Sequence, residues 1–279
     1  MIVGTMQTMS VQMTESVMKK DILTNVLVQA NTEKGEVYYV GPSRSTFEIY
    51  SEDYIRKYLN INISKVVRSV KNDSTIIYSV IDENGKLWTW GENYYGQLGH
   101  GNNVDTKIPL CVSDITNTEL WEQYEKDSSF KIIDTIISED QATILLLDNK
   151  GKIWASGEYA IKHGNSSNSF ICISNLPNQE LTQEYIDNSE YKIVEIKVMN
   201  NSYVAIDNNN NAWVWGANTV GQLGNNTKNK ILYPYCISKA INVKIKDIYI
   251  YSGATFILDS DNNIWHCGAS VSSLASLTY

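Results

Sequence analysis

The side chains best suited to catalysis or metal binding are scattered through this sequence. Its three histidines are His100, His163 and His266, and the first two stand in similar loops. Imidazole is a common metal ligand, so a metal site shared by these two is the alternative to solvated loop histidines, which we favour. Acidic pairs such as Asp82-Glu83 fall in turn-like segments, and no order of Ser, His and Asp stands out from chance. The sequence therefore predicts no enzyme, no catalytic residues, no metal site and no cofactor.

Two glycine-rich loops are the next candidates for chemistry. Gly96-Gln97-Leu98-Gly99 recurs as Gly221-Gln222-Leu223-Gly224. Such loops can cradle phosphates, but neither is followed by the Lys-Ser/Thr pair of a phosphate-binding loop, and no helix N-terminus is evident. They predict backbone turns and not a nucleotide site.

Three of the four cysteines, Cys111, Cys172 and Cys236, occupy the same place in successive similar segments. Equivalent positions in neighbouring sheets lie about 10 Å apart, beyond the Cα separation of about 7 Å that a disulfide spans. No zinc-ligand spacing is present. We therefore expect buried free thiols that act as small apolar residues.

Recognition of another molecule through loops is the chemistry that remains. Binding residues collect on loops held by a rigid scaffold, and aromatic side chains commonly anchor interfaces. Alternatively, Tyr94 or Tyr95 only covers the edge of the sheet that carries it. The predicted partner-binding residues come from three similar loops: Glu92, Asn93, Tyr94, Tyr95, Tyr159, Asn218 and Thr219.

The elements that position these loops repeat along the chain. Residues 82–99 recur with high fidelity at 207–224, and shorter copies surround Trp154 and Trp265. A fainter copy surrounds Tyr38. The aromatic residue recurs at intervals of 50 to 66 residues, a period typical of solenoids, propellers or arrays.

Each unit contains four short apolar segments. Residues 192–198 alternate apolar and polar side chains, which favours a strand with one packed face, and residues 76–81 are continuously apolar, which favours a strand buried on both faces. Asp-Glu-Asn-Gly at 82–85 predicts a hairpin turn, because Asp, Asn and Gly tolerate positive φ. The third strand carries the tryptophan. Four antiparallel strands per unit are typical of a propeller blade.

The repeat resembles that of the regulator of chromosome condensation (RCC) repeat family, which forms β-propellers. The resemblance rests on Asp-x-x-Gly-x-Leu/Ile-Trp-x-Trp-Gly, then four residues, then Gly-Gln-Leu-Gly, with a Pro-x-x-Val-like strand at 109–112 and 234–237. It covers residues 65–268 well and 22–50 faintly. The sequence departs from the family where Lys162-His163-Gly164 replaces Gly-Gln-Leu-Gly, where the Gly and His before the second strand survive only as Gly253, and in having fewer than seven units.

We therefore expect an all-β fold, a β-propeller of about five four-stranded blades with short helical inserts between them. It is either a closed five-blade ring or an open arc of a seven-blade propeller. The chain would be a single domain over 1–279, with units near 1–60, 61–126, 127–187, 188–239 and 240–279. Glycines would permit turns and tryptophans would fill the wedges between sheets: Trp88, Trp90, Gly91, Gly96, Gly99, Trp154, Gly157, Trp213, Trp215, Gly216, Gly221, Gly224, Trp265 and Gly268.

Helices are predicted at about 118–126 and 179–187, and a third at 52–59. Thr116 followed by Glu119 fits a capping box for the first of them. The helices either pack on the neighbouring blade or form a partner surface. The unit after Cys236 lacks this insert, so that side of the molecule should be flatter.

Composition limits the partners. The formal net charge of −8 argues against binding nucleic acid through its phosphates. No apolar run approaches the roughly 20 residues of a membrane helix, and residues 1–16 do not form a secretory signal, although a truncated or processed start would leave the same trace. We expect a soluble, cytoplasmic protein without membrane contact.

The expected function is a non-catalytic scaffold that binds another protein. The resemblance implies such a partner, because the family includes small-GTPase exchange factors, chromatin binders and a β-lactamase inhibitor. The alternatives are a guanine-nucleotide exchange factor or regulator of a small GTPase, an inhibitor of a partner enzyme, or a fragment of a larger multidomain protein. An open arc would have two unpaired sheet edges and should self-associate.

Overall fold

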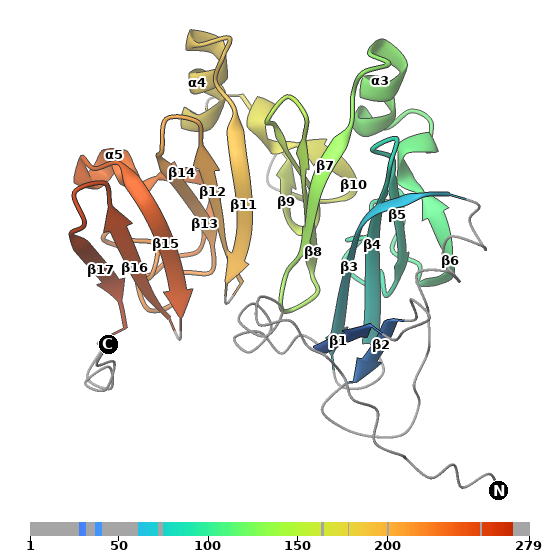
Figure 1. Cartoon of the computed structure of the whole chain (residues 1–279), viewed down its shortest axis with the longest axis horizontal. Helices are drawn as coiled ribbons and strands as arrows, with labels where there is room; N and C mark the ends of the chain where they lie inside the picture. Colours follow the sequence, from blue (N-terminus) through green and yellow to red (C-terminus); the bar gives the residue numbers. More distant parts are fainter. Residues whose placement is uncertain are drawn as a thin grey trace, which may run out of the picture.

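The structure is a computed structural model that describes residues 28–31, 37–40, 61–71, 75–162, 165–177, 179–199, 201–251 and 253–269. Within these residues the chain forms three four-stranded antiparallel sheets, one three-stranded sheet and one two-stranded sheet. Figure 1 shows the four larger sheets standing side by side as an arc of blades. We call them blade I (β3–β6), blade II (β7–β10), blade III (β11–β14) and blade IV (β15–β17).

The strands follow one another within each blade in chain order. The first strands are β3 (Ile63–Lys71), β7 (Ile132–Ile137), β11 (Ile193–Met199) and β15 (Ile245–Tyr251). The second strands are β4 (Thr75–Asp82), β8 (Thr143–Asp148), β12 (Ser202–Asp207) and β16 (Ala254–Asp259). The third strands are β5 (Leu87–Gly91), β9 (Ile153–Lys162), β13 (Ala212–Gly216) and β17 (Ile264–Gly268). The fourth strands are β6 (Thr106–Cys111), β10 (Asn165–Cys172) and β14 (Ile231–Cys236).

The predicted fold class, an all-β propeller of four-stranded antiparallel blades with short helices, is confirmed. The first predicted unit, 1–60, is described only at β1 (Val28–Asn31) and β2 (Val37–Val40), which pair antiparallel. In the third unit, where the Gly-Gln-Leu-Gly loop is missing, β9 and β10 extend toward each other and pair as far as Lys162 and Asn165.

Adjacent blades meet along their first strands. β7 lies against β3 and β4, and β11 lies against β7 and β8. Ion pairs also link neighbouring blades, Lys65 with Asp134 and Lys197 with Asp247. Partly exposed pairs of this kind contribute about 1 kcal/mol or less, so apolar packing between the sheets is the main force that holds the blades together.

The core consists of apolar clusters between neighbouring blades. Leu87 and Trp154 belong to the cluster shared by blades I and II, and Trp213 to the one shared by blades II and III. Trp154 and Trp213 are at most 2% exposed, as expected for indoles that fill wedges between sheets. Trp265 departs from the expectation because it is 40% exposed. Blade IV has no fourth strand among the described residues, so nothing in that part of the chain covers this indole.

The hairpin turns between second and third strands form as predicted. In blade II, Oδ1 of Asp148 accepts hydrogen bonds from the backbone N–H groups of Lys150 and Lys152 at 2.9 and 2.8 Å. Gly151 supplies the positive φ of 76° that the turn requires. The predicted motif glycines all have positive φ: Gly91, Gly96, Gly99, Gly157, Gly216, Gly221, Gly224 and Gly268.

The second tryptophan of the two best-conserved motif copies stacks within its own blade. The rings of Trp90 and Tyr78 are 4.5 Å apart between centroids, and those of Trp215 and Tyr203 are 5.5 Å apart. Trp90 is 3% exposed and Trp215 is fully buried. Trp88, the first tryptophan of blade I, is only half-buried.

Short helices cap one rim of the arc (Figure 1). The two predicted helices are present as α3 (Glu119–Lys126) and α4 (Glu180–Asp187). The predicted capping box is wrong, because the hydroxyl of Thr118, and not that of Thr116, accepts the N–H of Trp121 at 3.2 Å. The predicted helix at 52–59 lies outside the described residues.

Further short helical elements were not predicted. They are the 3₁₀ turns η1 (Val112–Asp114) and η2 (Ile173–Asn175) and the helix α5 (Ile237–Ile241). α5 occupies the connection that was expected to lack an insert.

The helices pack on the blades through apolar side chains. Leu120 and Leu181 are fully buried, and Glu119 of α3 accepts the backbone N–H of Cys172 in blade II at 3.2 Å. Tyr124 donates its hydroxyl to the carbonyl of Gly85 in blade I at 2.5 Å. α3 therefore bridges two blades.

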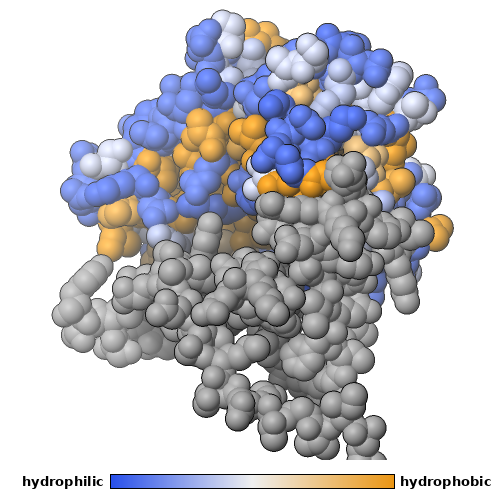
Figure 2. Space-filling view, turned by 45° about the vertical axis from the view of Figure 1, so that its right-hand side comes forward, coloured by the Kyte–Doolittle hydropathy of each residue, from blue (hydrophilic) through white to orange (hydrophobic). Residues whose placement is uncertain are grey.

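Cys111, Cys172 and Cys236 are buried free thiols, as expected. The coloured part of the surface in Figure 2 is mostly hydrophilic, with hydrophobic residues in patches. Within the described ranges, no helix is long and apolar enough to cross a bilayer.

Candidate functional site

The loop at 92–105 joins β5 to β6 on the rim opposite α3. Its shape is fixed by Asn93, whose side chain is fully buried. Asn93 Nδ2 donates to the carbonyl oxygens of Asn102 and Val104 at 2.9 and 3.3 Å, and its Oδ1 accepts the N–H of Leu98 at 2.9 Å. One amide thus binds the outgoing and returning halves of the loop together.

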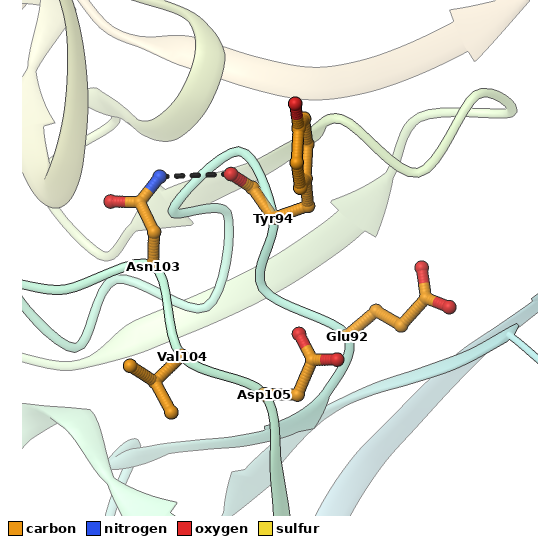
Figure 3. Close-up of a pocket in the computed structure, with 5 residues that line it drawn as sticks. All are labelled: Glu92, Tyr94, Asn103, Val104 and Asp105. Carbon is orange, nitrogen blue, oxygen red and sulfur yellow. Dashed lines mark hydrogen bonds between the residues drawn. The ribbon is translucent and has the colours of Figure 1, made fainter.

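A pocket of about 650 Å³ opens on this loop, lined by Glu92, Tyr94, Asn103, Val104 and Asp105. Figure 3 shows its residues on two chain segments that run side by side. Asn103 Nδ2 donates to the carbonyl oxygen of Tyr94 at 2.9 Å, and Asp105 Oδ1 accepts the N–H of Asn93 at 2.7 Å. These bonds hold the pocket walls in place without using the Tyr94 ring, the Glu92 carboxylate or Oδ2 of Asp105.

The pocket presents large apolar groups to solvent. Tyr94 is 76% exposed and Val104 is 68% exposed. Tyr95, next to the pocket, is 43% exposed and meets the Tyr94 ring edge-to-face, with centroids 5.0 Å apart. The expectation that one of these tyrosines covers a sheet edge does not fit Tyr94, because most of its surface faces water.

The structure separates the predicted partner-binding residues into different groups. Glu92 and Tyr94 line the pocket and Tyr95 adjoins it. Thr219 is exposed, but it lies on the corresponding loop of blade III and does not line the pocket.

Asn93 and Asn218 do not fit the predicted role, because both side chains are fully buried and serve as loop clamps. Tyr159 lies in β9, and its side chain is outside the described part of the structure.

Sequence reasoning missed Asn103, Val104 and Asp105. They stand on the returning half of the loop, nine or more residues beyond Tyr94. The pairing of Gly91 with Thr106 brings the two halves together. The sequence held one signal for this fold-back. Asn recurs at 93 and 218, and an Asn side chain that bonds to the backbone is typical of a turn or folded-back loop.

The two histidines that the structure describes, His100 and His266, lie on different blades. His100 Nε2 lies 2.8 Å from Oγ1 of Thr89, and burial lowers the pKa of His100 to about 4. His266 is exposed, and His163 lies outside the described residues. No group of three or more His, Cys, Asp or Glu side chains that would suit a metal ion occurs in the part of the chain that the structure describes.

Sequential antiparallel blades, three of them with four strands and blade IV with three among the described residues, each carry an aspartate-tryptophan hairpin and define a repeat protein of the β-propeller class. The family model "Regulator of chromosome condensation (RCC1) repeat" matches residues 84–121 and 209–258. These residues therefore carry RCC1 repeats, and the chain has the RCC1-like propeller fold, as the sequence resemblance predicted.

Two relatives illustrate the level of sequence similarity. The chain is 22% identical to human E3 ubiquitin-protein ligase HERC2 over 192 residues, which cover 68% of this chain and 4% of HERC2. It is 22% identical to mouse Protein RCC2 over 227 residues, covering 72% of this chain and 40% of RCC2.

Among solved structures, Prp20p from Saccharomyces cerevisiae matches with a TM-score of 0.54 and 18% identity. The match covers 80% of this chain and 47% of Prp20p. The chain thus spans less than half the length of these three proteins, and the likeness to Prp20p shows the fold alone.

Proposed function

We propose that this protein is a non-catalytic protein-binding module whose partner docks on the rim that carries the 92–105 loop. The observation that carries the proposal is the 76% exposure of Tyr94 at the mouth of a pocket on a rigid blade. Exposed aromatic side chains on such scaffolds are frequent anchors of protein interfaces, because they bury much apolar area with few rotatable bonds.

The comparison with blade III supports a functional reason for this tyrosine. The two loops share the Gly-x-Asn-x-x-Gly-Gln-Leu-Gly frame and the same clamp, since Asn218 Nδ2 donates to the carbonyl oxygens of Thr227 and Asn229. Blade III forms this loop with Thr219 at the place of Tyr94. The fold therefore does not require an aromatic residue there.

Affinity capture tests the proposal. The full chain and a Tyr94→Thr/Tyr95→Val variant, which carries the blade III residues, are used as baits and the captured proteins are quantified. A partner retained by the wild type and lost from the variant supports the proposal, provided that purified partner binds the wild type directly. The control is Tyr251→Thr, because Tyr251 is 58% exposed but lies on β15 at the other end of the arc. Equal capture by the wild type and the Tyr94/Tyr95 variant would reject this rim as the docking site.

A second candidate is regulation of a small GTPase. It is motivated by the fold shared with Prp20p, whose structure is described together with its binding to Gsp1p and histones. The test is release of a fluorescent guanine nucleotide from a panel of loaded GTPases in the presence of the chain. Accelerated release from one GTPase would favour this candidate, and unchanged release across the panel would reject it.

A further inference from the structure

The pocket on blade I combines apolar walls with uncompensated negative charge. Tyr94 and Val104 supply the exposed apolar groups, and Glu92 and Asp105 supply two carboxylates. Among the side chains that the structure describes, no lysine or arginine pairs with either carboxylate. This combination fits a side chain that has an apolar stem and a cationic end.

Glu158 of blade II is the counterpart of Glu92 and has a cationic partner. Glu158 follows Gly157 as Glu92 follows Gly91, and its carboxylate pairs with Lys230 Nζ of blade III at 3.1 Å. The loop that provides Lys230 in blade III is absent from blade II, where β9 and β10 form a hairpin instead. Among the side chains that the structure describes, blade II therefore offers Glu92 no counterpart of Lys230.

The charge of the pocket is not required by the fold. Pairing of Gly91 with Thr106 and of Gly216 with Ile231 places the two loops in the same register. In that register, Ala217 replaces Glu92 and Thr219 replaces Tyr94 on the outgoing half of the loop. On the returning half, Asn229 replaces Val104 and Lys230 replaces Asp105. One backbone frame thus carries an acidic, aromatic pocket on blade I and a neutral to basic loop on blade III.

We propose that the blade I pocket receives a lysine or arginine side chain presented by a partner protein. The aliphatic stem would lie against Val104 and the Tyr94 ring, where a cation also gains from the ring face. The cationic end would hydrogen-bond to Glu92 and to Oδ2 of Asp105, since Oδ1 already accepts the N–H of Asn93. The net charge of −8 would favour the approach of a basic partner. This inference rests on the proposed function, because it names the chemistry of the residue that docks.

Short peptides test the pocket directly. ¹⁵N-labelled full-length protein is titrated with acetyl-Gly-Lys-Gly-amide and acetyl-Gly-Arg-Gly-amide, and with the norleucine peptide, which has the stem without the charge. The basic peptides should shift the amide signals of Tyr94, Asn103 and Val104, and the norleucine peptide should not. Equal shifts with norleucine would overturn the role of charge. Putrescine binding as tightly as the peptides would overturn the assignment to a protein side chain.

Substitutions localise the effect. Glu92→Ala introduces the blade III residue, and Asp105→Asn keeps an oxygen acceptor for the Asn93 N–H. Each should weaken binding of the basic peptides about three- to tenfold, as expected for losing one charge-assisted contact at a partly exposed site. Glu125→Gln is the control, because it removes one charge from an exposed position of α3 on the opposite rim. Binding that is unchanged in both pocket variants would overturn the inference.

The partner found by affinity capture separates this inference from the proposed function. Binding that depends on Tyr94 and also weakens with Glu92→Ala supports both. Binding that depends on Tyr94 but is unchanged by Glu92→Ala and Asp105→Asn would still support the proposed function. It would contradict the inference that the pocket binds a lysine or arginine side chain.

Discussion

The indole Nε1–H of Trp154 donates to Oδ2 of Asp148 at 2.9 Å, and the two residues stand six positions apart. The same bond recurs in every blade that the structure describes: Trp88 to Asp82 at 3.3 Å, Trp213 to Asp207 at 3.2 Å and Trp265 to Asp259 at 2.8 Å. Because the other carboxylate oxygen accepts two backbone N–H groups of the hairpin turn, one aspartate both closes the turn and orients the tryptophan.

Replacing this aspartate in a blade whose tryptophan is buried should lower the stability of the fold substantially. Asp148→Ala removes the acceptor of three hydrogen bonds at a site where the carboxylate is 1% exposed and burial raises its pKa. We expect the free energy of unfolding to fall by about 3 kcal/mol or more, measured by urea denaturation. Asp259 is itself only 2% exposed, but its partner Trp265 is 40% exposed, so water can replace the acceptor of the indole N–H and the matched change Asp259→Ala should cost less. Equal losses would contradict the argument.

Alanine substitutions at two equivalent glycines should distinguish the cost of backbone strain from the cost of a clash between blades. Gly96 and Gly221 have φ of 74° and 84°. A Cβ on Gly96 would lie 2.4 Å from Cβ and 2.7 Å from Cα of Asn168 in blade II, whereas the nearest atom to a Cβ on Gly221 is 3.6 Å away. Gly221→Ala should therefore cost about 1 kcal/mol, for positive φ alone, and Gly96→Ala about 3 kcal/mol or more. Thermal and urea denaturation measure both, and similar costs would show that blades I and II do not pack as described.

The sequence revealed the blade because each copy needs the same chemistry locally. Asp148 and Trp154 must stand six residues apart for one carboxylate to reach both the turn and the indole, so the pattern survives in every described unit. The strand order then follows from short connections. The α3 and α4 helices were also visible, because Leu120 and Leu181 mark the buried positions of two aligned inserts.

The features that escaped sequence analysis depend on contacts between distant residues. Val104 and Asp105 reach the pocket only because the Asn93 clamp folds the loop back, and their residue types differ from those of the matching loop. The exposure of Trp265 could not be read from its motif, which is intact, because it results from the strand that blade IV lacks among the described residues. The cap was predicted two residues too early, because Thr116 has Glu119 three residues on, whereas Thr118 has Trp121 at that distance.

The four cysteines should differ sharply in reactivity. Burial raises the pKa of Cys111 and Cys172 to about 12 and that of Cys236 to about 11, so almost no thiolate forms at pH 8. Cys267 is only half-buried. We expect Ellman's reagent to modify Cys267 alone in the folded protein and all four thiols in urea. Cys267→Ala should abolish the reaction of the folded protein, and fast reaction of more than one thiol would contradict the burial of the other three.

Stability should depend on pH through His100. Its imidazole titrates near pH 6.5 in the unfolded chain, and burial lowers its pKa to about 4 in the folded chain. As the pH falls below 6.5, the unfolded state therefore binds a proton before the folded state does. The contribution of His100 to the free energy of unfolding is complete above pH 6.5 and is lost as the pH falls toward 4. Allowing for its partial exposure, we expect a loss of about 1 kcal/mol between pH 7 and pH 5.

His100→Asn isolates this effect, because Asn225 occupies the matching place in the blade III loop and shows that the fold accepts asparagine there. Urea denaturation at pH 7, 6 and 5 should show a smaller loss of stability on acidification for His100→Asn than for the wild type. His266→Asn, which changes an exposed histidine of β17, should retain the wild-type pH dependence. If His100→Asn kept the full pH dependence, the titration would belong to other groups, and the hydrogen bond from His100 to Thr89 would not be holding a neutral imidazole in the loop.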